Sequence, residues 1–257
     1  MKILAVGDIV GESGVKKAVE VIPKLKEEEK IDFIVVNGEN AAGGMGITRR
    51  IFDELIESGA DVVTMGNHTW GKKEIFSFID HPKIVRPANY TAGLPGKGYG
   101  IYFCRDKKIV VMNLIARTSM GILSENPFIV AEEIIKNIKD EVDIIIVDFH
   151  GEATAEKIAM GYFLDGKASI VYGTHTHVQT ADETILPNGT AYITDIGKTG
   201  PKHSVIGMDI EVSLKRFVTS LPERYQLADG EASFNSCLFE INDENNQIMK
   251  IKRINIE

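Results

Sequence analysis

Side chains that can bind a metal ion follow five separate apolar runs of the sequence. Each run is short and rich in β-branched residues, as a buried strand is, and the polar residues come directly after it. They are Asp8 after ILAVG, Glu39 and Asn40 after FIVVNG, Asn67 and His68 after VVTMG, His150 after IIIVDF, and His175 and His177 in the THTH after IVYG. Imidazoles mixed with oxygen donors suit manganese, iron, zinc, nickel or cobalt better than calcium, which prefers oxygen alone.

The size of this set favours two ions rather than one. It offers more donors than a single tetrahedral ion with an open position accepts. Two ions about 3.5–4 Å apart, sharing one carboxylate and a bridging hydroxide, would use them. Two divalent ions less two carboxylates and one hydroxide leave a local charge of about +1, which attracts a phosphodiester monoanion.

Each of these residues alone has a simpler explanation. An Asp or Asn at the end of a strand is commonly the N-cap of the next helix, and Asp8 taken alone fits that role. A lone His at a strand end commonly makes a structural hydrogen bond, and Asn40 could lie behind the ligands and orient them. The coincidence of five strand ends, with THTH as the most specific fragment, outweighs these explanations.

The strands that carry these residues alternate with helical segments in the first part of the chain. Strands are predicted over 2–6, 32–36 and 61–65, and helical periods over 14–30, 47–59 and 72–80. This alternation is typical of βαβ units on a parallel sheet, where the carboxyl ends of the strands form one crevice. The polar residues are therefore expected to converge. Pro23 should kink the first helix or split it into two pieces.

Past residue 98 the pattern mixes hairpins with helices. Hairpins are predicted over 99–115, 183–194 and 237–256, helices over 127–142 and 153–166, and strands over 143–149 and 169–173. The mixture predicts an α/β fold, an α/β/β/α sandwich in which two packed mixed β-sheets are flanked by helices. We expect a single domain over residues 1–257. Residues 205–234 fit neither period and are expected to form a lid or a helical excursion.

Composition and charge exclude several classes of protein. Charged residues make up 26% of the chain and hydrophobic residues 44%, which is typical of a globular protein. The net charge of −8 opposes binding to duplex DNA or to an anionic membrane, while a local positive site could still attract a small nucleotide. Cys104 and Cys237 lack the spacing of a zinc ribbon or a disulfide framework. No signal sequence and no membrane-spanning run is recognised, so a cytoplasmic location is expected.

Three further features are assigned no chemistry. His81 is expected at the end of a helix, as a partner of the helix dipole or a surface residue. His203 is expected to be structural, although its Gly-rich loop could border the site. The segment GDIVGESG lacks the GxGxxG spacing, and Asp8 and Glu12 would repel a pyrophosphate, so no dinucleotide site is expected.

The ordered motifs resemble those of the calcineurin-like metallophosphoesterases. They are GD at Gly7–Asp8, GEN at Gly38–Asn40, GNH at Gly66–His68, the strand-end His150, and GTHTH at Gly173–His177. Within that superfamily the chain is similar to the YmdB-like bacterial branch, whose members act on cyclic nucleotides, and the similarity continues through DFHGEATAEK and TDIGKTGP. Three departures from the superfamily pattern agree with that branch. They are Val10 in place of His, Glu39 in place of a bridging Asp, and Thr69 after GNH in place of Asp or Glu.

The resemblance implies a ligand set and a mechanism. One ion would be held by Asp8, Glu39, Asn40 and His177, and Glu39 would bridge to a second ion held by Asn67, His150 and His175. Asn40 would replace the missing imidazole of the first motif. A metal-bridging hydroxide would attack a phosphodiester in line, and His68, without a metal, would protonate the leaving alkoxide as general acid. The two ions are expected to be iron or manganese, divalent or of mixed valence, with zinc, cobalt or nickel as alternatives.

The expected function is the hydrolysis of cyclic nucleotides, with 2′,3′-cyclic nucleotides favoured by the resemblance. One alternative is a phosphomonoesterase or protein phosphatase on the same metal core, and another is a slow enzyme that acts mainly as a regulatory nucleotide sensor. A dimetal oxidoreductase of the helical-bundle type is excluded, because the ligands follow strands. Trp70 or Tyr162 could stack on a base, although both are expected in the core. The resemblance also implies a homo-oligomer.

Overall fold

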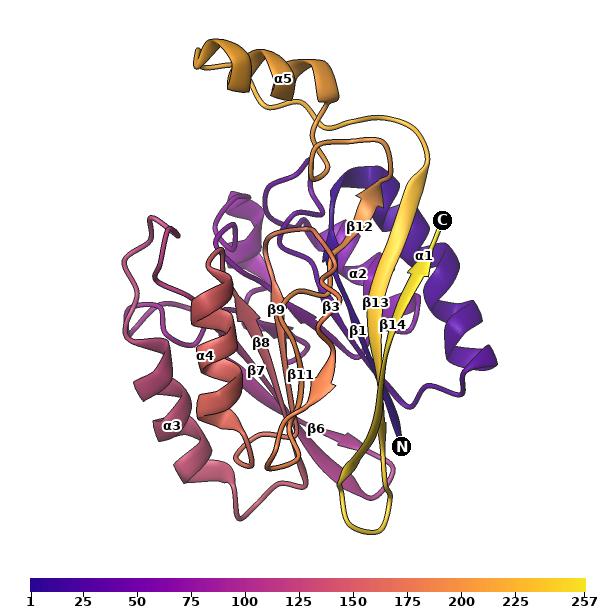
Figure 1. Cartoon of the computed structure of the whole chain (residues 1–257), viewed down its shortest axis with the longest axis vertical. Coiled ribbons are helices and arrows are strands. Elements are labelled where there is room, and N and C mark those ends of the chain that lie inside the picture. The colour runs from indigo at the N-terminus through magenta and orange to yellow at the C-terminus, as the bar shows by residue number, and fades with distance from the viewer.

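The computed structural model describes all 257 residues as two β-sheets with helices against their outer faces (Figure 1). The first sheet consists of β1 (Lys2–Val6), β2 (Asp8–Ile9), β3 (Phe33–Asn37), β4 (Val62–Thr64), β5 (Ile84–Val85), β12 (Lys198–Pro201), β13 (Ala232–Ile241) and β14 (Ile248–Ile256). Its strand order is β2-β12-β13-β1-β3-β4-β5, with β14 paired to β13. The first sheet therefore joins the two ends of the chain.

The second sheet is built from the middle of the chain. It consists of β6 (Tyr99–Cys104), β7 (Lys107–Ile115), β8 (Ile144–His150), β9 (Ile170–Thr174), β10 (Thr184–Ile185) and β11 (Ala191–Ile193), in the order β10-β11-β9-β8-β7-β6. Strands β1 and β3 are parallel, as are β7, β8 and β9, whereas β13 pairs with β1 and β6 with β7 in antiparallel fashion. The predicted fold with two mixed sheets is confirmed.

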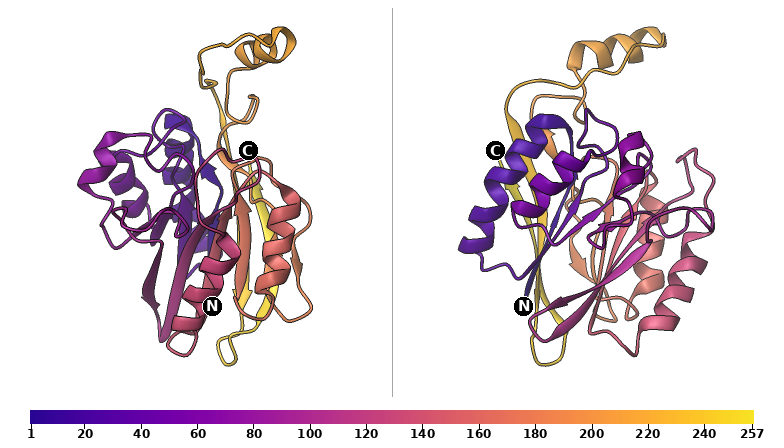
Figure 2. Two further views of the ribbon diagram at one scale, coloured as in Figure 1. Left: turned by 90° about the vertical axis from the view of Figure 1, so that its left-hand side faces the viewer. Right: turned by 180° about the vertical axis from the view of Figure 1, so that it is seen from behind.

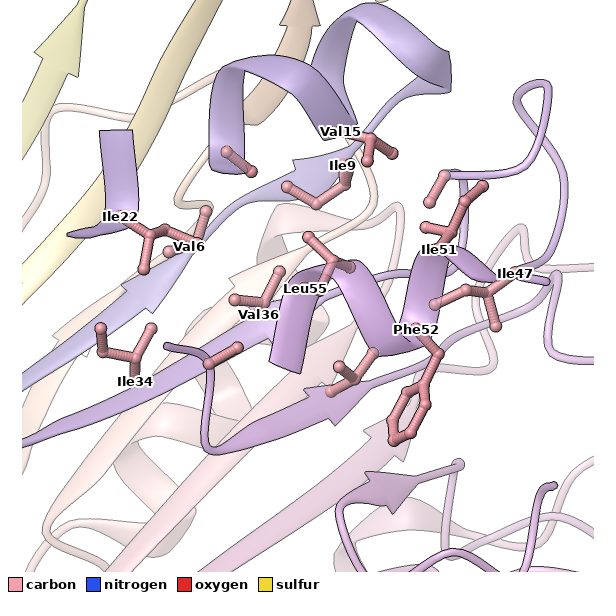
Figure 3. Close-up of a cluster of buried hydrophobic side chains, with 14 of the residues drawn as sticks. Val6, Ile9, Val15, Ile22, Ile34, Val36, Ile47, Ile51, Phe52 and Leu55 are labelled. Atoms are coloured by element: carbon pink, nitrogen blue, oxygen red, sulfur yellow. The ribbon is translucent and has the colours of Figure 1, made fainter. Parts of the chain in front are cut away.

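Two pairs of helices cover the outer faces of the sandwich (Figure 2). Helices α1 (Gly11–Glu28) and α2 (Arg49–Glu57) lie on the first sheet, and α3 (Pro127–Ile138) and α4 (Thr154–Leu164) on the second. In α2 the buried residues Ile51, Phe52 and Leu55 follow the helical period, and they pack with Ile34 and Val36 of β3 (Figure 3). The apolar stripe of each helix thus anchors it to its sheet.

The long apolar runs of the strands arise because both faces of each sheet are covered. In β1 and β3, Leu4 and Ile34 face the cluster under α1 and α2. Their neighbours Ile3 and Phe33 face the cluster between the sheets. Since successive side chains of a strand point to opposite faces, a strand buried on both faces is apolar along most of its length.

Two expectations about helices are wrong. Helix α1 continues from Gly11 to Glu28 through Pro23, so the predicted split into two pieces is wrong, while a kink at Pro23 stays a prediction. Pro23 lies on the exposed face of α1, so water can bind the carbonyl that proline leaves without a donor. Residues 72–80 form only a short 3₁₀ helix, η1 (Lys73–Ser77), rather than an α-helix.

The segment 205–234 carries helix α5 (Ile210–Thr219), which stands away from both sheets at the top of Figure 1. Ser213 is the only buried residue of α5, and Phe217 and Val218 are 76% and 81% exposed. A helical excursion is therefore present, whereas its role as a lid and the single-domain organisation stay predictions. None of the helices combines the length and the apolar character needed to cross a membrane.

Candidate metal centre

The five polar strand ends meet at one edge of the sandwich, and they come from both sheets. Asp8 lies in β2, Glu39 and Asn40 follow β3, and Asn67 and His68 follow β4, all in the first sheet, while His150 ends β8 and His175 and His177 follow β9 in the second. The polar side chains thus converge as expected, but the crevice where they meet is formed by two sheets rather than one. The parallel strands of both sheets direct their carboxyl ends to the same place.

Three donor atoms surround the Nε2 atom of His150. Asn67 Oδ1 lies 2.8 Å from it, His175 Nδ1 3.1 Å and Glu39 Oε1 3.2 Å. Atoms bound to one ion at about 2.1 Å lie about 3.0–3.4 Å apart. In the first donor group, Glu39, Asn67, His150 and His175, the distances from His150 Nε2 are therefore close to those between ligands of a single cation, and one ligand atom each of Glu39, His150 and His175 lies within 4.8 Å of the others.

A second donor group shares the Oε1 atom of Glu39 with the first. Asn40 Nδ2 is 3.0 Å from Glu39 Oε1 and 3.1 Å from His177 Nε2, and His177 Nε2 is 3.8 Å from Asp8 Oδ1. Asp8 Oδ1 is buried and has no hydrogen-bond partner, which is unusual unless a cation binds it. The two groups have the membership that the resemblance implies, while the role of each residue as a ligand stays a prediction.

The charges of the two histidines in the first group depend on burial and on the carboxylates around them. Burial disfavours the charged form of His150, but the carboxylates of Glu39, Asp8 and Asp148, with Glu39 foremost, together outweigh burial and raise the pKa of His150 to about 9. Burial, followed by the charge of His150, lowers the pKa of His175 to about 3. A proton on His150 Nε2 thus sits among the donors where a cation would bind. A metal ion would replace that proton, because a ligating imidazole is neutral.

Each of the three histidines in these groups is oriented through its other ring nitrogen. The partners are Thr174 Oγ1 at 2.9 Å from His150 Nδ1, Glu152 Oε2 at 3.3 Å from His175 Nε2, and the Ile206 carbonyl at 2.7 Å from His177 Nδ1. Metal-binding histidines are held in this way in proteins, because the outer partner fixes the ring and its tautomer. The inward nitrogens are therefore available to a metal.

The outer partner of His150 is itself fixed by a carboxylate that the sequence interpretation missed. Thr174 Oγ1 donates to Asp148 Oδ1 at 2.7 Å, so it must accept its other hydrogen bond from His150 Nδ1. Asp148 is buried and also accepts from Asn37 Nδ2 at 3.2 Å. The signal for Asp148 was present in DFH, because residues two apart in a strand share a face.

Gly66 leaves the room that the first donor group needs. A Cβ atom at this position would clash with Glu39 Oε2 and with Nε2 of His150. Any side chain there would enter the space between these two donors. The glycine of GNH is therefore required by the shape of the site.

The backbone of the THTH segment is held by a buried ion pair. His175 and His177 have φ angles of 97° and 64°, which cost about 1–3 kcal/mol each for residues other than glycine. Lys157 Nζ donates to the Thr174 carbonyl and to Asp195 Oδ2, both at 2.7 Å. Asp195 Oδ2 also accepts from Thr176 N at 3.0 Å. The Lys157–Asp195 pair thus holds the backbone at Thr174 and Thr176, on both sides of His175.

A pocket of about 510 Å³ opens over the two groups. Its floor carries Glu39, Asn40, Asn67, His68, His175 and His177, and its walls include Glu152, Met45, Ile206, Met208, Tyr225 and Leu227. No Lys or Arg lines it. The histidines that were assigned no chemistry lie elsewhere, since neither His81 nor His203 lines this pocket.

The aromatic residues suggested for base stacking also lie outside the pocket. Trp70 stacks on Phe76, with 5.2 Å between ring centroids. Tyr162 projects from α4 and is 61% exposed, so the expectation of a core position is wrong for this residue. The ring that lines the pocket is Tyr225, which the sequence interpretation did not select.

Comparison with known proteins gives long matches. A family model described as YmdB-like protein matches residues 4–254. A Bacillus subtilis (strain 168) relative named 2′,3′-cyclic-nucleotide 2′-phosphodiesterase is 50% identical over 255 residues, covering 99% of this chain and 96% of the relative. A Mycoplasma pneumoniae relative named putative phosphatase/phosphodiesterase is 34% identical and covers 100% of this chain and 93% of its own.

Solved structures agree with the fold. A hypothetical protein from Thermus thermophilus matches with a TM-score of 0.93 and 36% identity, covering 99% of this chain and 98% of that one. A novel phosphatase from Mycoplasma pneumoniae matches with a TM-score of 0.94 and 34% identity, covering 100% and 93%. From the span of the family model and the identity to these relatives, it follows that the chain belongs to the YmdB-like family.

Proposed function

We propose that the chain is a metal-dependent phosphodiesterase that hydrolyses nucleoside 2′,3′-cyclic phosphates. The observation that carries this proposal is the pair of donor groups that share Glu39 on the floor of one pocket. The Bacillus subtilis relative supports the substrate, because its name states this activity and the two chains are 50% identical.

The two donor groups would each hold one cation. Asp8, Glu39, Asn40 and His177 form one set, and Glu39, Asn67, His150 and His175 form the other. When bound, two such ions neutralise phosphoryl oxygens and increase the acidity of water. The mixture of imidazole and oxygen ligands in the two donor groups suits iron or manganese.

We expect His68 to protonate the leaving group. Its backbone N–H donates to Glu39 Oε2 at 2.9 Å, and its Nδ1 lies 2.8 Å from Asn40 Oδ1. These contacts fix the ring, whose side chain is 32% exposed and lines the pocket. Its Nε2 can then carry the proton that the departing alkoxide needs.

Asn40 would couple the metal centre to His68. The Asn40 nitrogen faces Glu39 and His177, and its oxygen faces His68. Because an amide binds cations through oxygen, ligation by Asn40 requires the amide to turn by about 180°. Its nitrogen would then donate to His68 Nδ1. A neutral His68 would consequently hold its proton on Nε2, where an acid is required.

The charge of the pocket favours a diester over a monoester. No Lys or Arg lines the pocket, and Glu39 and Glu152 add negative charge. The dianion of a phosphomonoester would therefore depend on the cations alone for neutralisation, whereas a cyclic diester carries a single charge. This argues against the phosphatase alternatives.

The test is turnover of 2′,3′-cyclic AMP by protein loaded with iron or manganese, with the product isomer identified by chromatography. We expect metal-dependent release of 3′-AMP, because cleavage of the 2′ ester leaves the 3′ phosphate. Faster hydrolysis of 4-nitrophenyl phosphate than of 2′,3′-cyclic AMP would favour a phosphomonoesterase. Two bound ions without turnover of either ester would favour a nucleotide sensor. Cytoplasmic location and self-association stay predictions.

A further inference from the structure

We propose that an apolar shelf beside the metal centre binds the nucleobase of the substrate, with Tyr225 stacked on the base. This inference rests on the proposed function and adds a second subsite to it. The apolar shelf consists of Met45, Ile206, Met208, Tyr225 and Leu227, which line the same pocket as the donor groups.

The pocket has two chemically different parts. Its floor carries carboxylates, amides and imidazoles, whereas Met45, Ile206 and Tyr225 of the shelf are 47%, 48% and 65% exposed. Apolar side chains left open to solvent beside a polar site commonly mark a binding surface. A ligand that fits both parts has a phosphodiester at one end and a flat apolar group at the other, as a nucleotide has.

Backbone pairing between the two ends of the excursion, at residues 207–208 and 227–228, holds the shelf in place. Met208 forms backbone bridges with Val205 and Leu227, and Ala228 N donates to the Gly207 carbonyl at 3.0 Å. Leu227 also packs against the loop that follows β3. A Cβ atom added to Gly44 of this loop would lie only 3.0 Å from Leu227 Cδ2. The shelf is therefore fixed, although α5 beyond it is exposed.

The shelf is also joined directly to the metal centre. Ile206 contributes its side chain to the shelf and its carbonyl to His177 Nδ1, at 2.7 Å. The same residue thus holds a metal-centre histidine and forms the wall where the base would lie. A base on the shelf and a phosphate on the floor would consequently keep a constant separation.

Tyr225 is the residue suited to stacking. It is the only Phe, Tyr or Trp that lines the pocket. Its ring stands between this pocket and a smaller one lined by Arg216, whose guanidinium lies 4.9 Å from the ring centroid. This cation–π contact steadies one side of the ring. Because every base has a π-face, stacking on Tyr225 should accept all four bases, with purines preferred.

The experiment compares two substrates with the same five-membered cyclic phosphate, of which only one has a base. They are 2′,3′-cyclic AMP and glycerol 1,2-cyclic phosphate. Tyr225→Ala should raise KM for 2′,3′-cyclic AMP about tenfold with little change in kcat, and Tyr225→Phe should restore the KM of the unaltered protein. Neither variant should change the kinetics with glycerol 1,2-cyclic phosphate. Tyr162→Ala is the matched control, because Tyr162 is similarly exposed at 61% but lies outside the pocket.

Binding provides a readout that does not depend on turnover. Calorimetric titration with 3′-AMP should show about tenfold weaker binding for Tyr225→Ala than for the unaltered protein. Equal losses with both cyclic phosphates would overturn the proposal, since Tyr225 would then support the pocket rather than the base. So would unchanged affinity for 3′-AMP. If the unaltered protein hydrolyses neither substrate, the proposed function fails, and the titration still decides the role of the shelf.

Discussion

The metal centre and the excursion over residues 205–234 differ in how firmly their side chains are held. In the metal centre, Asp8, Glu39 and His150 are fully buried, and the ring of His150 has partners on both nitrogens. In the excursion, α5 buries only Ser213. Ligand geometry tolerates little movement, whereas α5, which contributes no residue to the pocket, can be weakly anchored. The comparison predicts large effects at the centre and small effects on α5.

The largest effect is expected for Gly66→Ala. The added methyl would enter the space between Glu39 Oε2 and His150 Nε2, so metal affinity should fall by more than about a hundredfold and turnover should be lost. Metal content after dialysis and turnover of 2′,3′-cyclic AMP measure both effects.

Gly93→Ala is the control for Gly66→Ala. A Cβ there meets nothing within 4 Å, although the φ of +85° makes alanine unfavourable. This variant should lose about 1–2 kcal/mol of unfolding free energy and bind metal normally. Normal metal binding by Gly66→Ala would contradict the assignment of the first donor group.

The next effect separates chemistry from metal binding. His68→Ala should keep both ions, because His68 belongs to neither donor group, and should lower kcat by about 10²–10⁴-fold as expected for a general acid. The loss should be greatest for substrates with poor leaving groups. His203→Ala, an exposed histidine outside the pocket, should leave kcat unchanged. Loss of metal from His68→Ala would show that the role assigned to it is wrong.

A smaller effect is expected behind the ligands. Thr174→Val keeps the shape of the buried side chain but removes the hydroxyl between His150 Nδ1 and Asp148 Oδ1. Metal affinity should fall by about 10–100-fold, and Thr174→Ser should restore it. The control is Thr190→Val, which removes a buried hydroxyl bound to the Ala168 carbonyl at 2.6 Å; Thr190 lies at the amino ends of β9 and β11, opposite the strand ends that carry the centre. Equal metal affinity in the two valine variants would exclude an orienting role for Thr174.

The donor residues could be predicted from the sequence because each one follows a local signal. An apolar run marks a strand, and a polar residue directly after it marks the end of that strand, as at Asp8 and His150. Parallel strands then bring these ends together whichever sheet they belong to. Two sheets with outer helices followed from the same alternation of strands and helices.

The contacts that orient the donors could not be predicted, because they join residues without a local pattern. Asp195 follows β11 in the way that the donors follow their strands, but nothing local to it or to Lys157 in α4 indicates that the two side chains meet, since they do so only through tertiary packing. Tyr225 lies in the segment with no clear period, and residue type alone points to Trp70 or Tyr162 as stacking candidates. Pro23 shows the same limit, since packing of the buried face of α1 outweighs the local preference of proline.

The smallest effect is expected on α5, and it completes the comparison. Phe217 is 76% exposed, so Phe217→Ala should change the free energy of unfolding by less than about 0.5 kcal/mol. Phe52→Ala is the matched substitution in the core, where the ring is 1% exposed, and it should cost about 3–5 kcal/mol. Denaturant unfolding at two protein concentrations measures both. A large loss for Phe217→Ala that shrinks on dilution, as the unaltered protein dissociates, would mean that α5 is covered by another copy of the chain, because only association makes stability depend on concentration.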